Sequence, residues 1–410
     1  MRFVVLMAVG VGCSGGHDLA PDGSPDGPAA SCPQAGPGTV HVHPLVAAAT
    51  ILTHDASGAF SSRIETTSTD VVDVQVPPCG AITLVASPSL YETTTDLVDG
   101  DELYALVQVQ PSPTSTTRVI VDSPLANVTN YLASAGCGGG QGAVDVALTY
   151  RQDCVDAAGR ATVVVFPYSV PPTPFAYALF EDVVLADPLH VTAWTTDAPH
   201  HQITFELDKP PGYTHCSANS MRGSTGFIGS GIVQQPVDPT PTTVDVQFAE
   251  FGDGYGFLCS ATNESTRYYW KSAAGALPAA LTLREADFVP DIVPAPLEGD
   301  GTRVVVVYNV MPSTSDEDLV MMEVGGTGAS GAFALWRLFA PPGTRRGTVP
   351  EVPDDLKIAF TTESLQSIRV FESTDAAGYR EAVRNTVRFY IGAPGGEALR
   401  TFRWTEWRRQ

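Results

Sequence analysis

Short apolar runs separated by turn residues dominate the chain after its first forty residues. The runs are rich in Val, Ile, Thr, Phe and Tyr; some alternate with polar residues and others are continuously apolar. Alternation predicts strands buried on one face, and continuous runs of this length predict strands buried on both. Gly, Pro, Asp and Ser between the runs predict turns. The clearest expected strands are 71–76, 118–121, 161–166, 244–248 and 303–308.

Helical periodicity is hard to find. The segment 272–285 contains good helix formers but is interrupted by Gly275 and Pro278, and 378–387 is a short candidate helix. Because no long helix alternates with the strands, the pattern argues against a parallel α/β enzyme fold. We expect an all-β protein made of antiparallel β-sandwiches.

A strand that runs into proline recurs along the chain. It is found at 119–124, 203–212 and 333–343, and the last two copies align closely. Proline ends a strand because it cannot donate a hydrogen bond to the ladder. The recurrence suggests structurally related β-domains in tandem, with chance matching in a proline-rich chain as the alternative.

Composition excludes several classes of protein. The 45 acidic residues outnumber the 23 Lys and Arg, giving a net charge of −22, so we expect no nucleic-acid partner. Charged residues make up 17% of the chain, far below a coiled coil, and no apolar run approaches the ~20 residues that cross a bilayer. With 43% hydrophobic residues, the chain has enough apolar surface to form buried cores.

The first residues read as an export signal. Arg2 is followed by an apolar stretch that stops at small residues before Cys13, and this stretch is too short to span a bilayer. Small residues directly before a cysteine resemble the lipobox of bacterial lipoproteins. The resemblance implies a signal peptide at 1–12 and a lipid on Cys13; an ordinary export signal is the alternative. Residues 13–38 have little to bury and predict a flexible tether.

The cysteine count suits disulfides in an exported protein. If Cys13 carries lipid, the seven cysteines leave an even set of six. Six cysteines allow 15 connectivities, and pairing in sequence order closes the shortest loops. A zinc site is the competing explanation, but no CxxC spacing is present. The expected pairs are Cys32 with Cys79, Cys137 with Cys154, and Cys216 with Cys259.

Part of the N-terminal half resembles a known family. Residues 48–58 look like the strand, polar turn and glycine of the carboxypeptidase regulatory-like domain, a small Ig-like β-sandwich, and the segments that follow, to residue 85, are similar to its next three strands. Continuing to Tyr104, the arrangement is similar to large surface lipoproteins of Gram-negative bacteria with GC-rich genomes. Twenty Arg against three Lys agree with such a genome. The resemblance implies a non-catalytic sandwich domain and transfers no active-site residues.

These observations together predict tandem Ig-like antiparallel β-sandwich domains. After the signal peptide and the tether, we expect a carboxypeptidase regulatory-like domain at 39–112, β-sandwich domains at 113–200 and 201–330, and a C-terminal β-domain at 331–410.

The sequence offers histidines but no complete catalytic motif. GxSxG, HExxH, Walker, GxGxxG and EF-hand patterns are missing from it. His41 and His43 share one face of a strand, a spacing that suits zinc or copper, and His54 is near them if the two strands pair; a solvent-facing pair is the alternative. His200 and His201 point to opposite faces if extended, which does not favour a metal site.

Acidic turns and aromatic clusters are further candidate binding sites. Acidic turns offer oxygen ligands to calcium, but none has the ordered alternation of a dedicated site, so we expect hairpin turns. Exposed aromatics in a row would bind sugar rings, whereas aromatics on strands more commonly pack in cores. The acidic turns are 99–102, 250–254, 298–301 and 315–318, and the aromatics lie at 255–257, 268–270, 336 and 402–407.

We therefore predict a lipid-anchored protein of the outer membrane, on its periplasmic face or at the cell surface, without a catalytic centre, metal or cofactor. Its expected role is adhesive, scaffolding or ligand-binding, with the membrane, through the lipid, and a glycan or envelope protein as partners. A carbohydrate-binding surface protein is the first alternative. A hydrolase with an unrecognised β-fold site is the second, and it predicts carboxylates or a Ser–His pair converging with perturbed pKa values.

Overall fold

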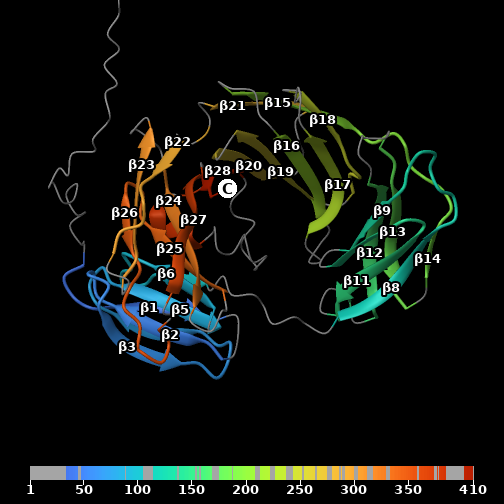
Figure 1. Cartoon of the computed structure of the whole chain (residues 1–410). Coiled ribbons are helices and arrows are strands. Elements are labelled where there is room, and N and C mark those ends of the chain that lie inside the picture. The colour runs from blue at the N-terminus through green and yellow to red at the C-terminus, as the bar shows by residue number, and fades with distance from the viewer. Residues whose placement is uncertain are drawn as a thin grey trace, which may run out of the picture. The chain divides into compact units, whose positions relative to one another are not determined.

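The computed structural model describes most of the chain from residue 34 onward, and the account below concerns this part (Figure 1). The described residues are 34–44, 48–87, 89–104, 114–135, 138–152, 155–156, 158–168, 175–186, 188–207, 213–221, 227–236, 243–251, 254–263, 266–274, 279–285, 288, 291–299, 303–311, 317–328, 333–357, 360–373, 376, 378–384 and 401–409. They form strands β1 to β28 and a helical turn at 379–384.

The strands fall into four consecutive groups, which we call repeats one to four. Repeat one contains β1 (Gly38–His43), β2 (Thr50–His54), β3 (Phe60–Glu65), β4 (Val72–Val76), β5 (Ala81–Ser87), β6 (Leu90–Thr94) and β7 (Glu102–Tyr104). Repeat two contains β8 (Thr114–Val121), β9 (Tyr131–Ser134), β10 (Gly138–Gly142), β11 (Asp145–Arg151), β12 (Arg160–Pro167), β13 (Ala178–Val184) and β14 (Leu189–Val191). Repeat three contains β15 (His200–Glu206), β16 (Tyr213–Met221), β17 (Phe227–Pro236), β18 (Thr243–Gln247), β19 (Gly254–Asn263), β20 (Thr266–Ala274) and β21 (Ala280–Arg284). Repeat four contains β22 (Asp291–Pro294), β23 (Val305–Met311), β24 (Leu319–Gly328), β25 (Phe333–Ala340), β26 (Arg346–Thr348), β27 (Phe360–Glu372) and β28 (Thr401–Arg408).

The repeats share one strand order. Repeat one has the orders β4-β1-β7 and β3-β2-β5-β6, and repeat three has the equivalent orders β18-β15-β21 and β17-β16-β19-β20. Repeat two shows the same two orders, joined through β10 and β11 into one sheet. In these three repeats the first and seventh strands pair in parallel, whereas the pairs within each hairpin are antiparallel. The common order supports a tandem of related sandwiches.

Repeat four departs from this pattern at one position. Its order β25-β24-β27-β28 matches the others, and β23 pairs with β26 as a first strand pairs with a fourth. In the other three repeats the seventh strand lies beside the first. In repeat four, β22 takes this position: it precedes β23 and pairs antiparallel with it. A bridge between Glu298 and Val305 extends this pairing. The segment that links repeats three and four therefore completes repeat four.

The four-stranded sheets of repeats three, four and one join edge to edge into one twelve-stranded sheet. Strand β20 pairs antiparallel with β28, and β25 pairs in parallel with β6. In Figure 1 the blue strand β6 lies next to the orange strand β25, although about 240 residues separate them in sequence. The β6–β25 pair thus connects the N-terminal and C-terminal repeats.

Both faces of the joined sheet are buried where repeats one and four meet. One core lies between the sheet and strands β1, β4 and β7, and the other lies on the opposite face, against β22, β23 and β26. Successive residues of β24 therefore enter different cores: Leu319 and Met321 the first, Val320 and Met322 the second. This arrangement explains the continuously apolar runs of the sequence, since neighbouring side chains of a strand point to opposite faces.

The predicted fold class is confirmed, because the chain is an all-β protein of the β-sandwich type. Four neighbouring pairs among the described strands run parallel, where the sequence led us to expect only antiparallel pairing.

Residues 266–274 and 280–284 are strands, so the interrupted helix pattern at 272–285 does not form a helix, whereas the short candidate at 378–387 contains the helical turn. The domain border expected at 330/331 lies between β24 and β25, which pair with each other, and the domain bounds stay a prediction.

Three edge strands, β3, β13 and β17, pair irregularly, as do the interior pairs β5–β6 and β24–β27. Strand β3 carries one extra residue, Ser61, opposite the end of β2; β13 has two residues opposite Thr162, and β17 has one extra residue, Ser230. The strands that join repeats, β6, β20, β25 and β28, pair across the junctions without a shift of register. Extra residues bend an edge strand and hinder the addition of another strand.

Candidate functional site

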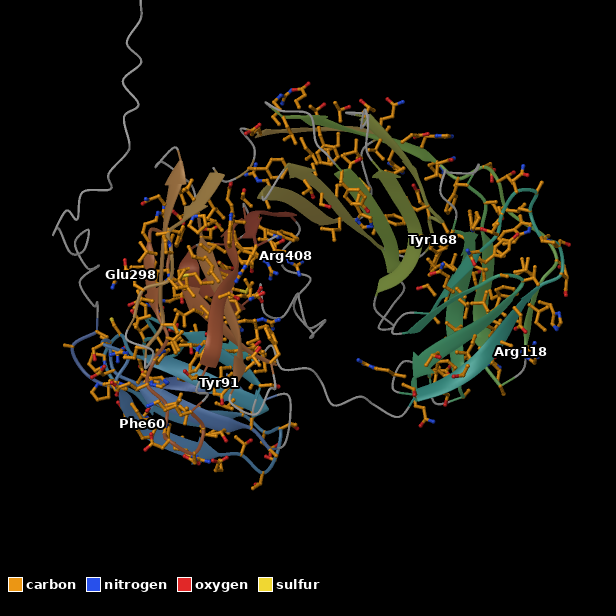
Figure 2. The ribbon with its side chains drawn as sticks, viewed as in Figure 1. Phe60, Tyr91, Arg118, Tyr168, Glu298 and Arg408 are labelled. Carbon is orange, nitrogen blue, oxygen red and sulfur yellow. A yellow bond between two sulfur atoms is a disulfide. The ribbon has the colours of Figure 1, made fainter. Side chains whose placement is uncertain are left out.

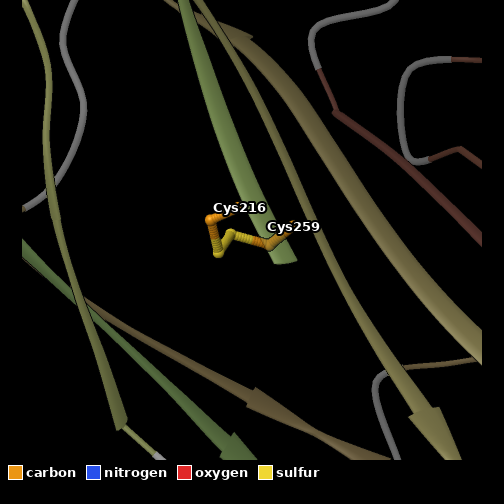
Figure 3. Close-up of a disulfide and its surroundings, with 2 residues drawn as sticks. All are labelled: Cys216 and Cys259. Carbon is orange, nitrogen blue, oxygen red and sulfur yellow. A yellow bond between two sulfur atoms is a disulfide. The ribbon is translucent and has the colours of Figure 1, made fainter. Parts of the chain in front are cut away.

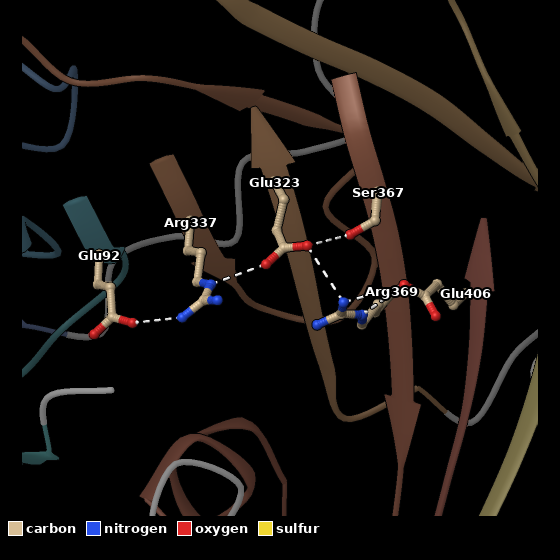
Figure 4. Close-up of polar contacts among 6 residues, drawn as sticks. All are labelled: Glu92, Glu323, Arg337, Ser367, Arg369 and Glu406. Atoms are coloured by element: carbon tan, nitrogen blue, oxygen red, sulfur yellow. Dashed lines mark hydrogen bonds and ion pairs between the residues drawn. The ribbon is translucent and has the colours of Figure 1, made fainter. Parts of the chain in front are cut away.

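The main buried polar feature is a row of charges across repeats four and one, which we call the charged ladder (Figure 4). From β6 to β28 its members are Glu92, Arg337, Glu323, Arg369 and Glu406. Arg337 binds Glu92 at 3.1 Å and Glu323 at 2.9 Å. Arg369 binds Glu323 at 3.3 Å and Glu406 at 3.1 Å. The carboxylates alternate with the guanidinium groups, so every neighbour in the row has the opposite charge.

The carboxylates of the ladder are buried, and the arginines keep only part of their surface in contact with solvent. The side chain of Glu323 is 9% exposed, against 26% for Arg337 and 21% for Arg369. Burial by itself raises the pKa of Glu323, but Arg369, a hydrogen bond from Ser367 and Arg337 together lower it below its ordinary value. Glu323 is therefore ionised at neutral pH and holds both arginines.

A second polar row crosses the same junction through the other face of the sheet, and we call it the hydroxyl row. His54 Nε2 lies 2.8 Å from Thr83 Oγ1, Thr83 Oγ1 lies 2.7 Å from Thr93 Oγ1, and Trp336 Nε1 donates to Thr93 Oγ1 at 2.9 Å. The ring of Trp336 stacks on Tyr91 with 4.6 Å between centroids. Figure 2 shows Tyr91 where the blue strands of repeat one meet repeat four. Polar contacts thus tie β6 to β25 on both faces.

His54 is fully buried at the end of the hydroxyl row. Its Nδ1 atom has no hydrogen-bond partner. Burial lowers the pKa of His54 to about 4, with Asp55 opposing and Arg303 adding to the shift. The imidazole is therefore neutral at pH 7.

A disulfide joins Cys216 and Cys259, which lie directly opposite each other on β16 and β19 (Figure 3). Both cysteines are buried in the core of repeat three. They are the third pair expected from the order along the chain. Cys79 is also disulfide-bonded. The remaining cysteines, Cys13, Cys32, Cys137 and Cys154, lie outside the described residues, so the lipid on Cys13 and the other two pairings stay predictions.

The histidines of β1 and β2 do not gather around a metal. His41 and His43 share the outer face of β1 as predicted, but His41 Nδ1 contacts Asp73 at 2.7 Å, whereas His43 stacks on Tyr104. His54 is far from this face, because β1 and β2 pair with different strands in different sheets. Among the residues that the structure describes, no group of three or more His, Cys, Asp or Glu is placed to hold a metal ion.

The adjacent pair His200 and His201 lies on opposite faces of β15. His200 is exposed and contacts Asp245 at 2.8 Å, and His201 is buried and contacts Glu250 at 2.7 Å. Each histidine therefore has its own carboxylate partner, as the alternation of a strand requires.

The described acidic turns take part in the fold. The carboxylate of Asp99 accepts the backbone N–H of Thr39, and Asp101 binds Arg380 at 2.5 Å and accepts the N–H of Val98. Glu298 pairs with Arg346 at 2.8 Å. The turn with Asp99 and Asp101 is not the expected hairpin, because it joins β6 to β7, which lie in different sheets, whereas Glu298 lies between the paired strands β22 and β23.

The largest described aromatic side chains pack in cores. Trp336 is 3% exposed and Trp404 6%, and Trp407 packs partly against the core of repeat four. Tyr269 lies opposite Trp404 in the β20–β28 pair. A row of exposed aromatics is therefore not found among the tryptophans at 336, 404 and 407.

Two aspartates come nearest to the perturbed carboxylates that a hydrolase would need. Burial raises the pKa of Asp96 and of Asp101, while Arg380 lowers both. Next to them, the hydroxyl of Tyr379 donates to the backbone oxygens of Thr95 and Phe339. The Asp101 carboxylate binds Arg380 and accepts the backbone N–H of Val98, so it fixes the loop that precedes β7.

The fold defines an all-β protein of the β-sandwich type with disulfide-linked strands. No protein-family model matches the chain, and no curated protein is similar to it in sequence. The resemblance to the carboxypeptidase regulatory-like domain remains a prediction. None of the helical residues in the described part forms a helix long and apolar enough to cross a membrane.

Sequence reasoning missed the charged ladder and the hydroxyl row. Glu323 follows Leu319–Met322, and Glu406 lies between Trp404 and Trp407, so both acids stand inside apolar or aromatic runs. A carboxylate within a strand that is otherwise buried is the one signal that points to an ion pair in the sheet. Their partners lie on strands far away in sequence, which the sequence does not identify.

Proposed function

We propose that the chain is a non-catalytic, lipid-anchored protein of the cell envelope with an adhesive, scaffolding or ligand-binding role. The observation that carries this proposal is that ionisable side chains bind one another across neighbouring strands. Glu92, Glu323 and Glu406 bind arginines of neighbouring strands within the charged ladder. His41 and His200 bind carboxylates across neighbouring strands. Groups that an enzyme would keep available for a substrate here connect strands.

The disulfide and the N-terminal sequence support an exported protein. Disulfides persist in oxidising compartments such as the periplasm and the cell surface. The lipobox-like sequence before Cys13 and the polar segment after it suit a folded body held away from a membrane by a tether. We place the protein on the outer membrane, at its periplasmic face or at the cell surface.

Protease treatment of intact cells tests the proposed location and role. Cells that produce the full chain are treated with a protease that does not cross the outer membrane, and the protein is followed by antibody. Loss of the body in intact cells supports a surface role, and glycan and partner-cell binding assays follow. Survival in intact cells with loss after permeabilisation directs the search to periplasmic partners. Recovery of the protein in the cytosolic fraction would refute the proposal.

The carbohydrate-binding alternative has a separate test. Full-length protein is applied to a glycan array together with the variant Trp270→Ala, which removes one aromatic residue of the cluster at 268–270. Tight binding of one glycan class that is lost in the variant would favour the alternative. Equal, weak signals in both proteins would favour an adhesive or scaffolding role that does not recognise sugars through this residue.

A further inference from the structure

The hydroxyl row contains a histidine whose surroundings favour the neutral ring over the protonated ring. His54 is 0% exposed, lies at the end of β2, and has one hydrogen-bond partner, Thr83. Its other ring nitrogen, Nδ1, has none. A buried polar atom without a partner costs free energy, and a buried charge without a partner costs more.

The direction of the hydrogen bonds favours the neutral ring. The indole N–H of Trp336 can only donate, so Thr93 accepts from it. Each hydroxyl proton of the row has an acceptor in only one arrangement. In it, Thr93 donates to Thr83, and Thr83 donates to Nε2 of His54. If Nε2 gains a proton, it can no longer accept. Thr83 must turn its proton toward Thr93, and the proton of Thr93 then has no acceptor in the row.

The charges around His54 come from two loops. Asp55, the next residue, favours the protonated ring, and Arg303, which precedes β23, opposes it. Arg303 donates to the backbone oxygen of Ser57 at 2.5 Å and lies 3.8 Å from Glu351. Nδ1 carries the ring proton when Nε2 accepts from Thr83, and neither acid is bonded to it, so neither compensates for the charge that a second proton on Nε2 creates.

The row ends at the junction that holds repeats one and four together. Trp336 belongs to β25 and Thr93 to β6, and these two strands form the parallel pair between the repeats. We propose that His54 makes this junction sensitive to acid. Its protonation disrupts the hydroxyl row and loosens the β6–β25 junction, while repeat two stays folded. The junction would then open more often in an acidic surrounding than at neutral pH.

Hydrogen exchange measures the opening of this junction. Using the lowered pKa of about 4 and an ordinary value of 6.5, linkage predicts that the opening constant rises roughly 30-fold between pH 7.5 and pH 5. The protection factors of residues 81–94 and 333–340 should fall by that factor in the full-length wild type. Those of residues 116–121 in repeat two, which contain no histidine, should change much less.

The variant His54→Gln keeps a polar atom near the position of Nε2 but does not titrate near neutral pH. We expect it to lose the acid response of 81–94, while His190→Gln, at an exposed ion pair in repeat two, should keep it. A 30-fold response that persists in His54→Gln would overturn the proposal. If that variant does not fold, the wild type alone decides, since equal loss of protection at 81–94 and at 116–121 would also overturn it.

Discussion

Replacement of Glu323 by glutamine tests whether the charged ladder holds the joined sheet together. The carboxylate accepts hydrogen bonds from Arg337 Nε at 2.9 Å, Arg369 Nη2 at 3.3 Å and Ser367 Oγ at 2.6 Å. Glutamine has nearly the same size, but it offers one acceptor oxygen and no charge. The change therefore isolates the electrostatic contribution of the site.

The expected cost follows from the bonds that are lost. Two charge-assisted hydrogen bonds contribute about 1.5–3 kcal/mol each, and removing one partner of a buried ion pair costs about 3–5 kcal/mol. We expect Glu323→Gln to lower the free energy of unfolding by about 3 kcal/mol at pH 7. Because the pKa of Glu323 is lowered in the folded state, its stabilising effect is present above the ordinary value of 4.5 and disappears as the pH falls through the folded pKa. The difference between the two proteins should therefore shrink in acid.

Guanidinium unfolding followed by tryptophan fluorescence measures this cost, since Trp336, Trp404 and Trp407 lie in the cores of repeats one and four. The matched control is Asp145→Asn, which removes an exposed cross-strand pair with Arg118 and should leave the midpoint unchanged. If Glu323→Gln unfolds within about 0.5 kcal/mol of the wild type at pH 7, the ladder does not hold the sheet and the reasoning fails.

Three further changes test other parts of the fold. Replacing Cys216 and Cys259 by alanine opens a loop of sequence separation 43 and should cost up to about 4 kcal/mol in guanidinium unfolding; an unchanged midpoint would contradict this. A Cβ atom added at Gly140 would lie 2.1 Å from a backbone oxygen of β11, so Gly140→Ala should cost about 1–3 kcal/mol, whereas Gly139→Ala, whose nearest atom is at 3.5 Å, should cost less; equal effects would refute the steric argument. Deleting Ser61 removes the extra residue of β3 and should promote self-association in size-exclusion chromatography, while a monomeric deletion variant would show that the irregularity does not protect this edge.

Much of the fold could be predicted because the strands bury apolar runs in a regular way. Residues 72–76 and 161–166 lie in strands, as their pattern indicated. The shared face of His41 and His43 follows from strand geometry alone, and so does the separation of His200 and His201.

The joined sheet could not be predicted, because its pairing connects distant parts of the chain. The strand 319–328 looks like a simple buried strand, and nothing in its sequence reveals that its two faces enter different cores. The parallel pairing of β25 with β6 places Arg337 beside Glu92, and neither residue carries a local signal of the other. Such contacts are fixed by packing and by the closure of long loops, which local pattern does not describe.

The charged and hydroxyl rows were missed for the same reason. Thr83 and Thr93 have the composition of ordinary strand residues, and their role appears only when β5, β6 and β25 are aligned. Single acids in apolar runs, such as Glu323, were the available clue.

Lipid labelling of the N-terminal cysteine tests the proposed function most directly. Cells producing the wild type, Cys13→Ala or Cys32→Ala are grown with labelled palmitate, and the protein is recovered by antibody. We expect label on the wild type and on Cys32→Ala, and no label on Cys13→Ala. A wild type without label would contradict the anchor, return Cys13 to the free thiols, and remove the even count that supports the two pairings Cys32 with Cys79 and Cys137 with Cys154.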